Sequence, residues 1–132
     1  MFTVSTKVDY GLLIMIELAK HSHRPFISLQ DIADQRHISS KYLSQLIIPL
    51  KQAGLVISKE GKTGGYQIAK PPSTITLRAI VEALDGPPHV VRCMDTKEQC
   101  PADHHCLTKP IWRQLSHTMY TLLEHQTLAD VV

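Results

Sequence analysis

The chain has 132 residues, of which 43% are hydrophobic and 20% are charged. This composition is typical of a folded globular protein and excludes a collagen-like or largely disordered chain. At this length we expect one domain with an extension rather than two independent hydrophobic cores. The net charge is only +2, but residues 36–70 contain six basic residues and one acidic residue, and the segments on either side are slightly acidic. This asymmetry indicates either a surface for a polyanion or a solvated lysine-rich face.

The sequence contains no pattern typical of membrane insertion or secretion. Its longest uninterrupted apolar run covers residues 12–16, which is far shorter than the roughly 20 residues that span a bilayer. The N-terminus has no basic segment that leads into an apolar region with a small-residue cleavage site. We therefore expect a cytoplasmic protein that does not contact membranes.

Two helices are predicted at the start of the chain. Apolar residues recur at helical spacing over residues 6–22, which predicts the first helix. Residues 28–37 begin with Ser28 as a candidate N-cap and have Asp31 three positions later. This pattern predicts a short second helix.

A third helix is predicted directly after a tight turn at residues 37–38. Ser39 and Ser40 are candidate N-caps, and apolar residues continue at helical spacing until an Ala-Gly stop at residues 53–54. Pro49 lies inside this segment and lacks an amide hydrogen, so we expect it to kink or loosen the last part of the helix.

A β-hairpin is predicted next. Two short runs of strand-forming residues, 55–57 and 66–68, flank a turn-rich segment that is basic and rich in glycine. Two helices joined by a tight turn and followed at once by a hairpin are typical of a winged helix-turn-helix. We therefore expect a DNA-binding domain over residues 1–72.

The remaining residues, 73–132, are predicted to form a helix, a cysteine-containing loop and a long helix. Thr76 is a candidate N-cap for the first of these helices, and Thr108 with Pro110 marks the start of the second. The long helix has one apolar stripe, formed by Ile111, Leu115, Met119 and Leu122 with Trp112 beside them. We expect this helix to form a homodimer interface; the alternative is that it packs against the first helix of its own chain. The expected fold is mainly α with a small β-wing, a winged helix-turn-helix plus a long C-terminal dimerisation helix.

In a helix-turn-helix, the N-terminal end of the second helix enters the major groove. The residues that could reach DNA from this end are Ser39, Ser40, Lys41, Tyr42, Ser44 and Gln45. Gln45 is the best candidate for reading a base, because its amide can pair bidentately with adenine. The two serines at the start could equally act only as helix caps, and Tyr42 could pack in the core. The candidates for phosphate contacts are Lys41, Lys51, Lys59 and Lys62.

All three cysteines lie in one polar segment, as Cys93, Cys100 and Cys106, with six and five residues between them. In a reducing compartment such thiols more often bind metal or sense redox state than form disulfides. Thiolates select zinc, copper(I) or iron–sulfur clusters. Structural zinc sites usually contain closer cysteine pairs, although a zinc site completed by His104 or His105 stays open. Unliganded thiols, or a disulfide with a spare thiol, are further alternatives. Four ligands are wanted, so the fourth must be something other than cysteine.

These motifs resemble those of the bacterial Rrf-type regulators typified by IscR, NsrR and the SUF-system regulators. The similar segments are YGLLIMIELA, SLQDIA, ISSKYLSQLIIPLKQAGLV, GGYQIA, ITLRAIVEALDG, the three spaced cysteines, CLTKPIW and TLADV, which together cover nearly the whole chain. The resemblance implies a homodimeric transcription regulator that binds operator DNA and an iron–sulfur cluster. It also implies that the long helix crosses to the partner and that the cysteine loop lies near the partner's winged domain.

The resemblance further suggests a fourth ligand. In IscR-like members this ligand is a histidine three residues after the last cysteine, but that position is Lys109 here. In NsrR-like members it resembles an aspartate in an N-terminal DYG motif of the other subunit, and Asp9 begins the same motif here. We therefore expect Asp9 of the partner subunit as the fourth ligand, with His104 or His105 as the fallback. The alternative for Asp9 is a solvated acid in the first turn of a helix.

We expect a regulator that senses iron–sulfur, redox or nitric oxide status through a 2Fe–2S or 4Fe–4S cluster and controls iron–sulfur assembly genes. The alternatives are a nitric-oxide-responsive repressor of the NsrR type and a zinc- or thiol-based redox regulator without a cluster. We expect no enzyme, because paired carboxylates, a nucleophile–base pattern and a phosphate-cradling loop are all missing. Two features depart from the family pattern. The six-residue gap between the first two cysteines leaves the cluster type open, and Glu60 lies in the wing where a basic residue is usual.

Overall fold

The computed structural model describes residues 3–94, 100–101 and 104–132 of the chain. Its elements are α1 (Thr6–Lys20), α2 (Leu29–Arg36), α3 (Ser40–Gln52), β1 (Val56–Lys59), β2 (Gly65–Ile68), the 3-10 turn η1 (Pro72–Thr74), α4 (Leu77–Asp85), the 3-10 turn η2 (Arg92–Met94), α5 (Lys109–His125) and α6 (Leu128–Val131). The fold is mainly helical with one small antiparallel sheet, as the sequence pattern predicts. No helix in the described part of the chain is long and apolar enough to cross a membrane.

Side-chain caps define where α2 and α4 begin. The hydroxyl oxygen of Ser28 accepts a hydrogen bond from the amide of Asp31 at 3.0 Å. The hydroxyl oxygen of Thr76 accepts one from the amide of Ala79 at 3.1 Å. Each bond satisfies an amide that has no partner within the first turn of its helix. The predicted starts of these two helices are confirmed.

A tight turn connects α2 to α3. His37 adopts a left-handed conformation there, with a φ angle of 55°. The third helix then continues through Pro49 without a break, and the carbonyl of Pro49 accepts a hydrogen bond from the amide of Ala53 at 3.0 Å. The apolar side chains of α3 that are buried are Leu43, Leu46, Ile47 and Leu50. This packing offsets the hydrogen bond that proline cannot donate, so the predicted helix is confirmed to its last turn.

The hairpin of β1 and β2 is the predicted wing. Its register pairs Val56 with Ile68 and Lys59 with Gly65. The backbone of Ile27 extends the sheet, because its carbonyl accepts a hydrogen bond from the amide of Tyr66 at 2.7 Å and its amide donates one back at 3.0 Å. Gly65 has a φ angle of 145°, and a Cβ atom there would lie 2.4 Å from the Ile27 carbonyl oxygen. A glycine is therefore needed where the wing meets the body of the protein.

One hydrophobic core holds the winged part together. α4 packs against α1 and α3, and α6 packs against α1 and η1. The largest fully buried side chains are Ile14, Met15, Leu18, Leu43, Leu50, Val56, Ile75, Ile80 and Leu128. The last elements of the chain thus return to the same core as α1 and α3.

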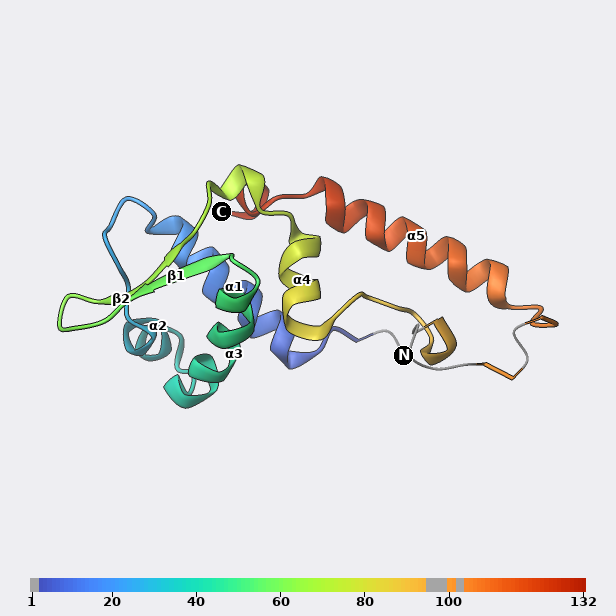
Figure 1. The fold of residues 1–132 in the computed structure, drawn as a ribbon, viewed down its shortest axis with the longest axis horizontal. Helices are drawn as coiled ribbons and strands as arrows, with labels where there is room; N and C mark the ends of the chain where they lie inside the picture. The colour runs from blue at the N-terminus through green and yellow to red at the C-terminus, as the bar shows by residue number, and fades with distance from the viewer. Residues whose placement is uncertain (1–2, 95–99, 102–103) are drawn as a thin grey trace.

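The long helix α5 leaves this body and projects away from it (Figure 1). It packs against α4 rather than α1. Arg78 of α4 forms ion pairs with Glu82 of the same helix at 2.8 Å and with Glu124 of α5 at 2.5 Å. The guanidinium of Arg78 also lies over the ring of Tyr120 on α5. Ser116 is the one buried residue of α5, and the predicted apolar stripe stays largely exposed. The alternative in which α5 packs on α1 of its own chain is not the arrangement seen.

Candidate nucleic-acid interface and cysteine pocket

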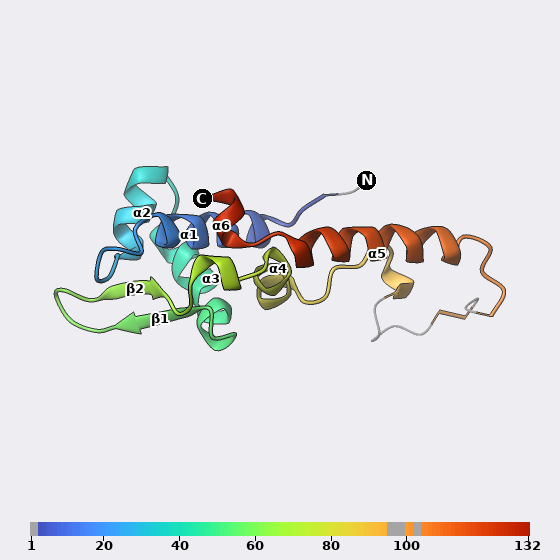
Figure 2. The ribbon, with the colours of Figure 1, turned by 90° about the horizontal axis from the view of Figure 1, so that it is seen from above.

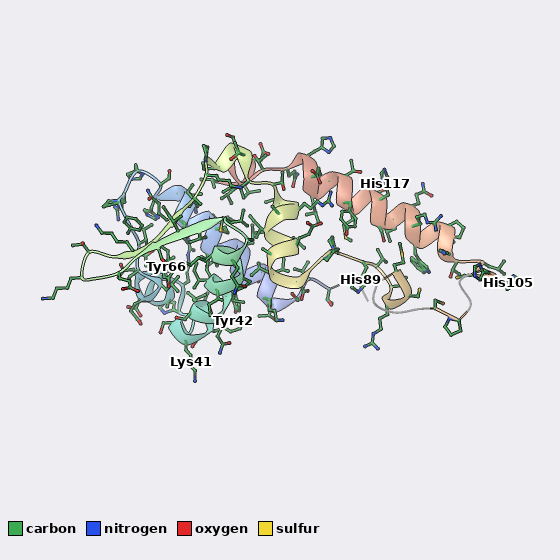
Figure 3. The ribbon with its side chains drawn as sticks, viewed as in Figure 1. Lys41, Tyr42, Tyr66, His89, His105 and His117 are labelled. Atoms are coloured by element: carbon green, nitrogen blue, oxygen red, sulfur yellow. The ribbon has the colours of Figure 1, made fainter. Side chains whose placement is uncertain are left out.

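The outer face of α3 presents polar side chains to solvent. Lys41, Ser44 and Gln45 are exposed, and Lys41 points away from the body of the molecule (Figure 3). These positions lie on the side of the helix opposite its buried leucines. The side chains expected to read bases are therefore accessible to a DNA duplex.

Two of the expected serines already make hydrogen bonds within the helix. The hydroxyl oxygen of Ser39 accepts a hydrogen bond from the amide of Tyr42 at 3.4 Å, which makes Ser39 the N-cap. The hydroxyl of Ser44 donates to the carbonyl oxygen of Ser40 at 2.8 Å. Among the exposed polar residues of this face in the described structure, the side chains of Lys41 and Gln45 make no such hydrogen bond within the helix.

Tyr42 is half-buried and contacts α1. Its ring meets the ring of Tyr10 edge-to-face, with centroids 5.7 Å apart and planes at 84°. Such a pair contributes roughly 0.5–1.5 kcal/mol beyond the area it buries. Sequence reasoning missed this contact, since it depends on how α1 and α3 cross. It joins the N-terminal part of α1 to the N-terminal part of α3.

The expected phosphate-binding lysines lie on α3 and the wing. Lys51 and Lys62 are exposed at the end of α3 and in the hairpin turn, and Glu60 is exposed beside Lys62. Lys59 instead lies over the ring of Phe26, with its ammonium nitrogen 5.8 Å from the ring centroid. A weak cation–π contact of this kind links Lys59, at the turn end of β1, to Phe26 in the segment between α1 and α2.

All three cysteines line one pocket. It is lined by Val91, Cys93, Met94, Cys100, Cys106, Lys109 and Trp112. All three thiols are free, and none forms a disulfide with another. The start of α5 therefore carries one wall of the pocket, and η2 carries the other.

Cys106 has a distinct electrostatic environment. Its sulfur lies 3.5 Å from the hydroxyl oxygen of Thr108. This hydrogen bond is the main cause that lowers the pKa of the Cys106 thiol. The backbone of Thr108 lowers it further, and the backbone and charge of Lys109 add smaller effects. Thr108 occupies the N-cap position of α5, as predicted, but its side chain makes no capping bond. Its hydroxyl serves the cysteine instead.

The candidates for a fourth ligand lie outside this pocket. Asp9 is exposed in the first turn of α1, and His104 and His105 are exposed in the loop before α5. Among the described residues, no three His, Cys, Asp or Glu side chains form a group that could hold a metal ion. Within the described part of one chain, the three cysteines line the same pocket, but their thiols do not form a three-ligand metal group, with or without one of these candidates.

Two exposed apolar residues were also missed by the sequence reasoning. Ile48 is 55% exposed on the outer face of α3, and Leu107 is 93% exposed beside Cys106. The signal for Ile48 was present in the sequence, because it falls three residues after Gln45 on the face that the helical period turns outward.

Comparison with known proteins identifies the relatives of this chain. The profile of the Rrf2 family, described as iron-dependent transcriptional regulators, matches residues 4–132. The HTH-type transcriptional regulator IscR of Yersinia pseudotuberculosis is 36% identical over 129 residues, which cover 98% of this chain and 78% of that protein.

Solved structures agree with this relationship. CymR, the global cysteine regulator of B. subtilis, is 38% identical with a TM-score of 0.81, over 99% of this chain and 96% of that one. IscR of T. potens is 34% identical with a TM-score of 0.80, over 98% of this chain and 85% of that one. These relatives are regulators of transcription rather than enzymes. The chain described here belongs to the Rrf2 family of iron-dependent, DNA-binding transcriptional regulators.

Proposed function

We propose that this protein is a homodimeric regulator whose affinity for operator DNA depends on an iron–sulfur cluster held by Cys93, Cys100 and Cys106. The observation that carries the proposal is that all three cysteines of the chain line one pocket at the start of α5. When bound, the cluster would supply a group that is sensitive to iron supply, oxidants or nitric oxide.

The chemistry of the residues around the pocket fits such a group, while the three thiols of one chain, all in its described part, do not form a metal-binding group by themselves. Three thiolates are the donor set that iron–sulfur clusters prefer. Val91, Met94 and Trp112 give the pocket apolar walls, which limit the access of water and so tune the stability of a bound cluster. The hydroxyl and the backbone of Thr108 favour the thiolate form of Cys106, the form that binds metal.

The fourth ligand is proposed to be Asp9 of the partner subunit. Its side chain is exposed, and it begins the DYG motif that resembles the NsrR pattern. Ligation by Asp9 would tie the first turn of α1 to the cysteine loop of the other chain. The next residue, Tyr10, contacts Tyr42 on α3, the recognition helix proposed to enter the major groove. A change in ligation at Asp9 would therefore shift the recognition helix through this aromatic pair.

The exposed stripe of α5 supports a homodimer. Ile111 is 59% exposed and Leu122 is 54% exposed on a helix that makes few contacts with its own chain. A second copy that covers this stripe would bring two recognition helices into one particle. Half-sites about one helical turn apart would then be bound only when the two helices have the right separation. As the resemblance to IscR implies, the targets would be genes for iron–sulfur cluster assembly.

A second candidate function is a thiol-based regulator without a cluster. It is favoured by the three free thiols in one pocket and by the similarity to CymR, the global cysteine regulator of B. subtilis. A nitric-oxide-responsive repressor of the NsrR type shares the cluster and the Asp9 ligand with the leading proposal, and differs only in the signal.

Metal analysis of protein purified without oxygen separates these functions. We expect iron and acid-labile sulfide, a visible absorption spectrum, and operator binding that changes when the cluster is removed. The Asp9→Asn variant should change the spectrum and lose cluster faster in air, whereas Asp34→Asn, at an exposed acid on α2, should match the wild type. Zinc, or no metal together with DNA binding that responds to disulfide formation, would contradict the cluster and favour the thiol regulator.

A further inference from the structure

Ile48 is the exposed exception among the large aliphatic residues of α3. It is 55% exposed, whereas Leu43, Leu46, Ile47 and Leu50 are all buried. Isoleucine is a weaker helix former than the polar residues that usually occupy a solvated helix face. Neither helix propensity nor packing within the chain therefore explains this residue.

The position of Ile48 places it among the candidates for base contact. With 3.6 residues per turn, its side chain leaves the helix within about 20° of the direction of Lys41 and between those of Gln45 and Ser44. The buried residues Leu43 and Leu50 point to the opposite side. An apolar side chain thus interrupts a polar stripe made of Lys41, Ser44 and Gln45, all exposed.

The chemistry of the major groove offers one apolar group at a base edge. Thymine presents its 5-methyl group there, while the other bases present only hydrogen-bond donors and acceptors. We propose that Ile48 is a specificity-determining residue that packs against the methyl group of a thymine in each operator half-site. This inference rests on the proposed docking of α3 in the major groove.

The helix geometry also limits where this thymine lies. Ile48 is about 4.5 Å further along the helix axis than Gln45, and base pairs are about 3.4 Å apart. Because the helix can be tilted against the DNA axis, this separation sets an upper limit, and the thymine lies no more than about one base pair from the pair that Gln45 contacts. If Gln45 reads an adenine, the half-site contains an adenine and a thymine methyl group in the same or in neighbouring base pairs.

Replacing thymine with deoxyuridine tests this contact, because the change removes only the methyl group. The operator is first selected from random duplex DNA with the wild-type protein, and each thymine is then replaced in turn. We expect that each half-site has one thymine whose single replacement weakens wild-type binding about fourfold, the factor that corresponds to one methyl group withdrawn from water. The same replacement should have no effect on the Ile48→Ala variant.

Two further variants keep the test specific. Ile57→Ala removes a similarly exposed isoleucine, 45% exposed, from β1, and should retain the full methyl effect. Ile48→Leu keeps an apolar side chain at the position and should retain a measurable part of it. Because Ile48 is exposed and alanine is the best helix former, Ile48→Ala should keep the thermal stability of the wild type.

The outcomes distinguish this inference from the proposed function. If the wild type enriches no DNA sequence, docking through α3 is wrong and the inference falls with it. If an operator is enriched but no uracil replacement weakens binding, or if Ile48→Ala shows the same methyl effect as the wild type, the contact with thymine is wrong while DNA recognition by α3 stands.

Discussion

At the scale of single residues, Gly11 determines how closely α1 approaches α4. A Cβ atom at this position would lie 2.2 Å from Cδ1 of Leu84 and 2.9 Å from its Cδ2. Leu84 is itself buried, so its side chain has little space into which it can move. Glycine inside a helix costs about 1 kcal/mol relative to alanine. Close packing of the two helices offsets this cost.

We expect Gly11→Ala to destabilise the protein by about 1–3 kcal/mol, the usual cost of overpacking a core. In a Leu84→Ala background the clash is absent, so the same change should instead stabilise the protein by about 1 kcal/mol through helix propensity. Urea denaturation of the four proteins measures both values. Equal effects of Gly11→Ala in the two backgrounds would show that Leu84 is not the residue it meets.

Residue-level features of the site differ in how well the sequence predicts them. The helical period alone places Lys41 and Gln45 on the outer face of α3, and the clustering of cysteines alone indicates one site. The bond between Thr108 and Cys106 could not be predicted, since the same threonine was equally suited to cap α5. The contact of Tyr10 with Tyr42 depends on a crossing of helices that no local pattern encodes.

At the scale of elements, α6 shows how a short segment can hold the fold together. Leu128 is completely buried, and its amide donates to the carbonyl oxygen of Ile75 at 2.8 Å. The carbonyl of Gln126 in turn accepts a hydrogen bond from the amide of Leu77 at 2.9 Å. These contacts attach the end of the chain to the start of α4.

We expect Leu128→Ala to lower the free energy of unfolding by about 2–5 kcal/mol, because it leaves a cavity in the core. Val131→Ala, at an exposed position on the same helix, should change it by no more than about 0.5 kcal/mol. Thermal and urea denaturation provide the measurement. Similar small effects of both changes would mean that α6 contributes little to the core.

Length explains which helices the helical period predicts. α1, α3 and α5 are long enough for the apolar residues to show a helical period, and each was expected. α6 has only four residues, too few for a period, and its stability comes from tertiary contacts. Its one local signal is the capping box in which the amide and hydroxyl of Thr127 both donate to the carboxylate of Asp130.

At the scale of the whole molecule, the expected DNA-binding end and the cysteine pocket lie far apart. The wing forms one end of the long axis, and the loop before α5 forms the other (Figures 1 and 2). Within one chain they are connected through α4, which packs on both α3 and α5. A second chain would shorten this path, since its α1 and recognition helix could lie beside the cysteine loop of the first.

The proposed dimer is tested by placing a charge in the apolar stripe of α5. Leu115 is 40% exposed beside Ile111, and burying an unpaired carboxylate at a subunit interface is strongly unfavourable. We expect Leu115→Glu to be monomeric by light scattering, at 14.8 kDa, with an unchanged far-ultraviolet circular dichroism spectrum. Its affinity for a two-half-site operator should fall more than tenfold, since each monomer holds only one half-site.

A matched control lies on the other side of the same helix. His117 is exposed and points about 200° away from Leu115 around the helix axis, so His117→Glu adds the same charge to α5 without entering the stripe. This variant should remain dimeric and bind the operator normally. If His117→Glu is monomeric while Leu115→Glu remains dimeric, the interface lies on the opposite face of α5. In that case Asp9 of one chain would have to reach the cysteines of the other by a different approach.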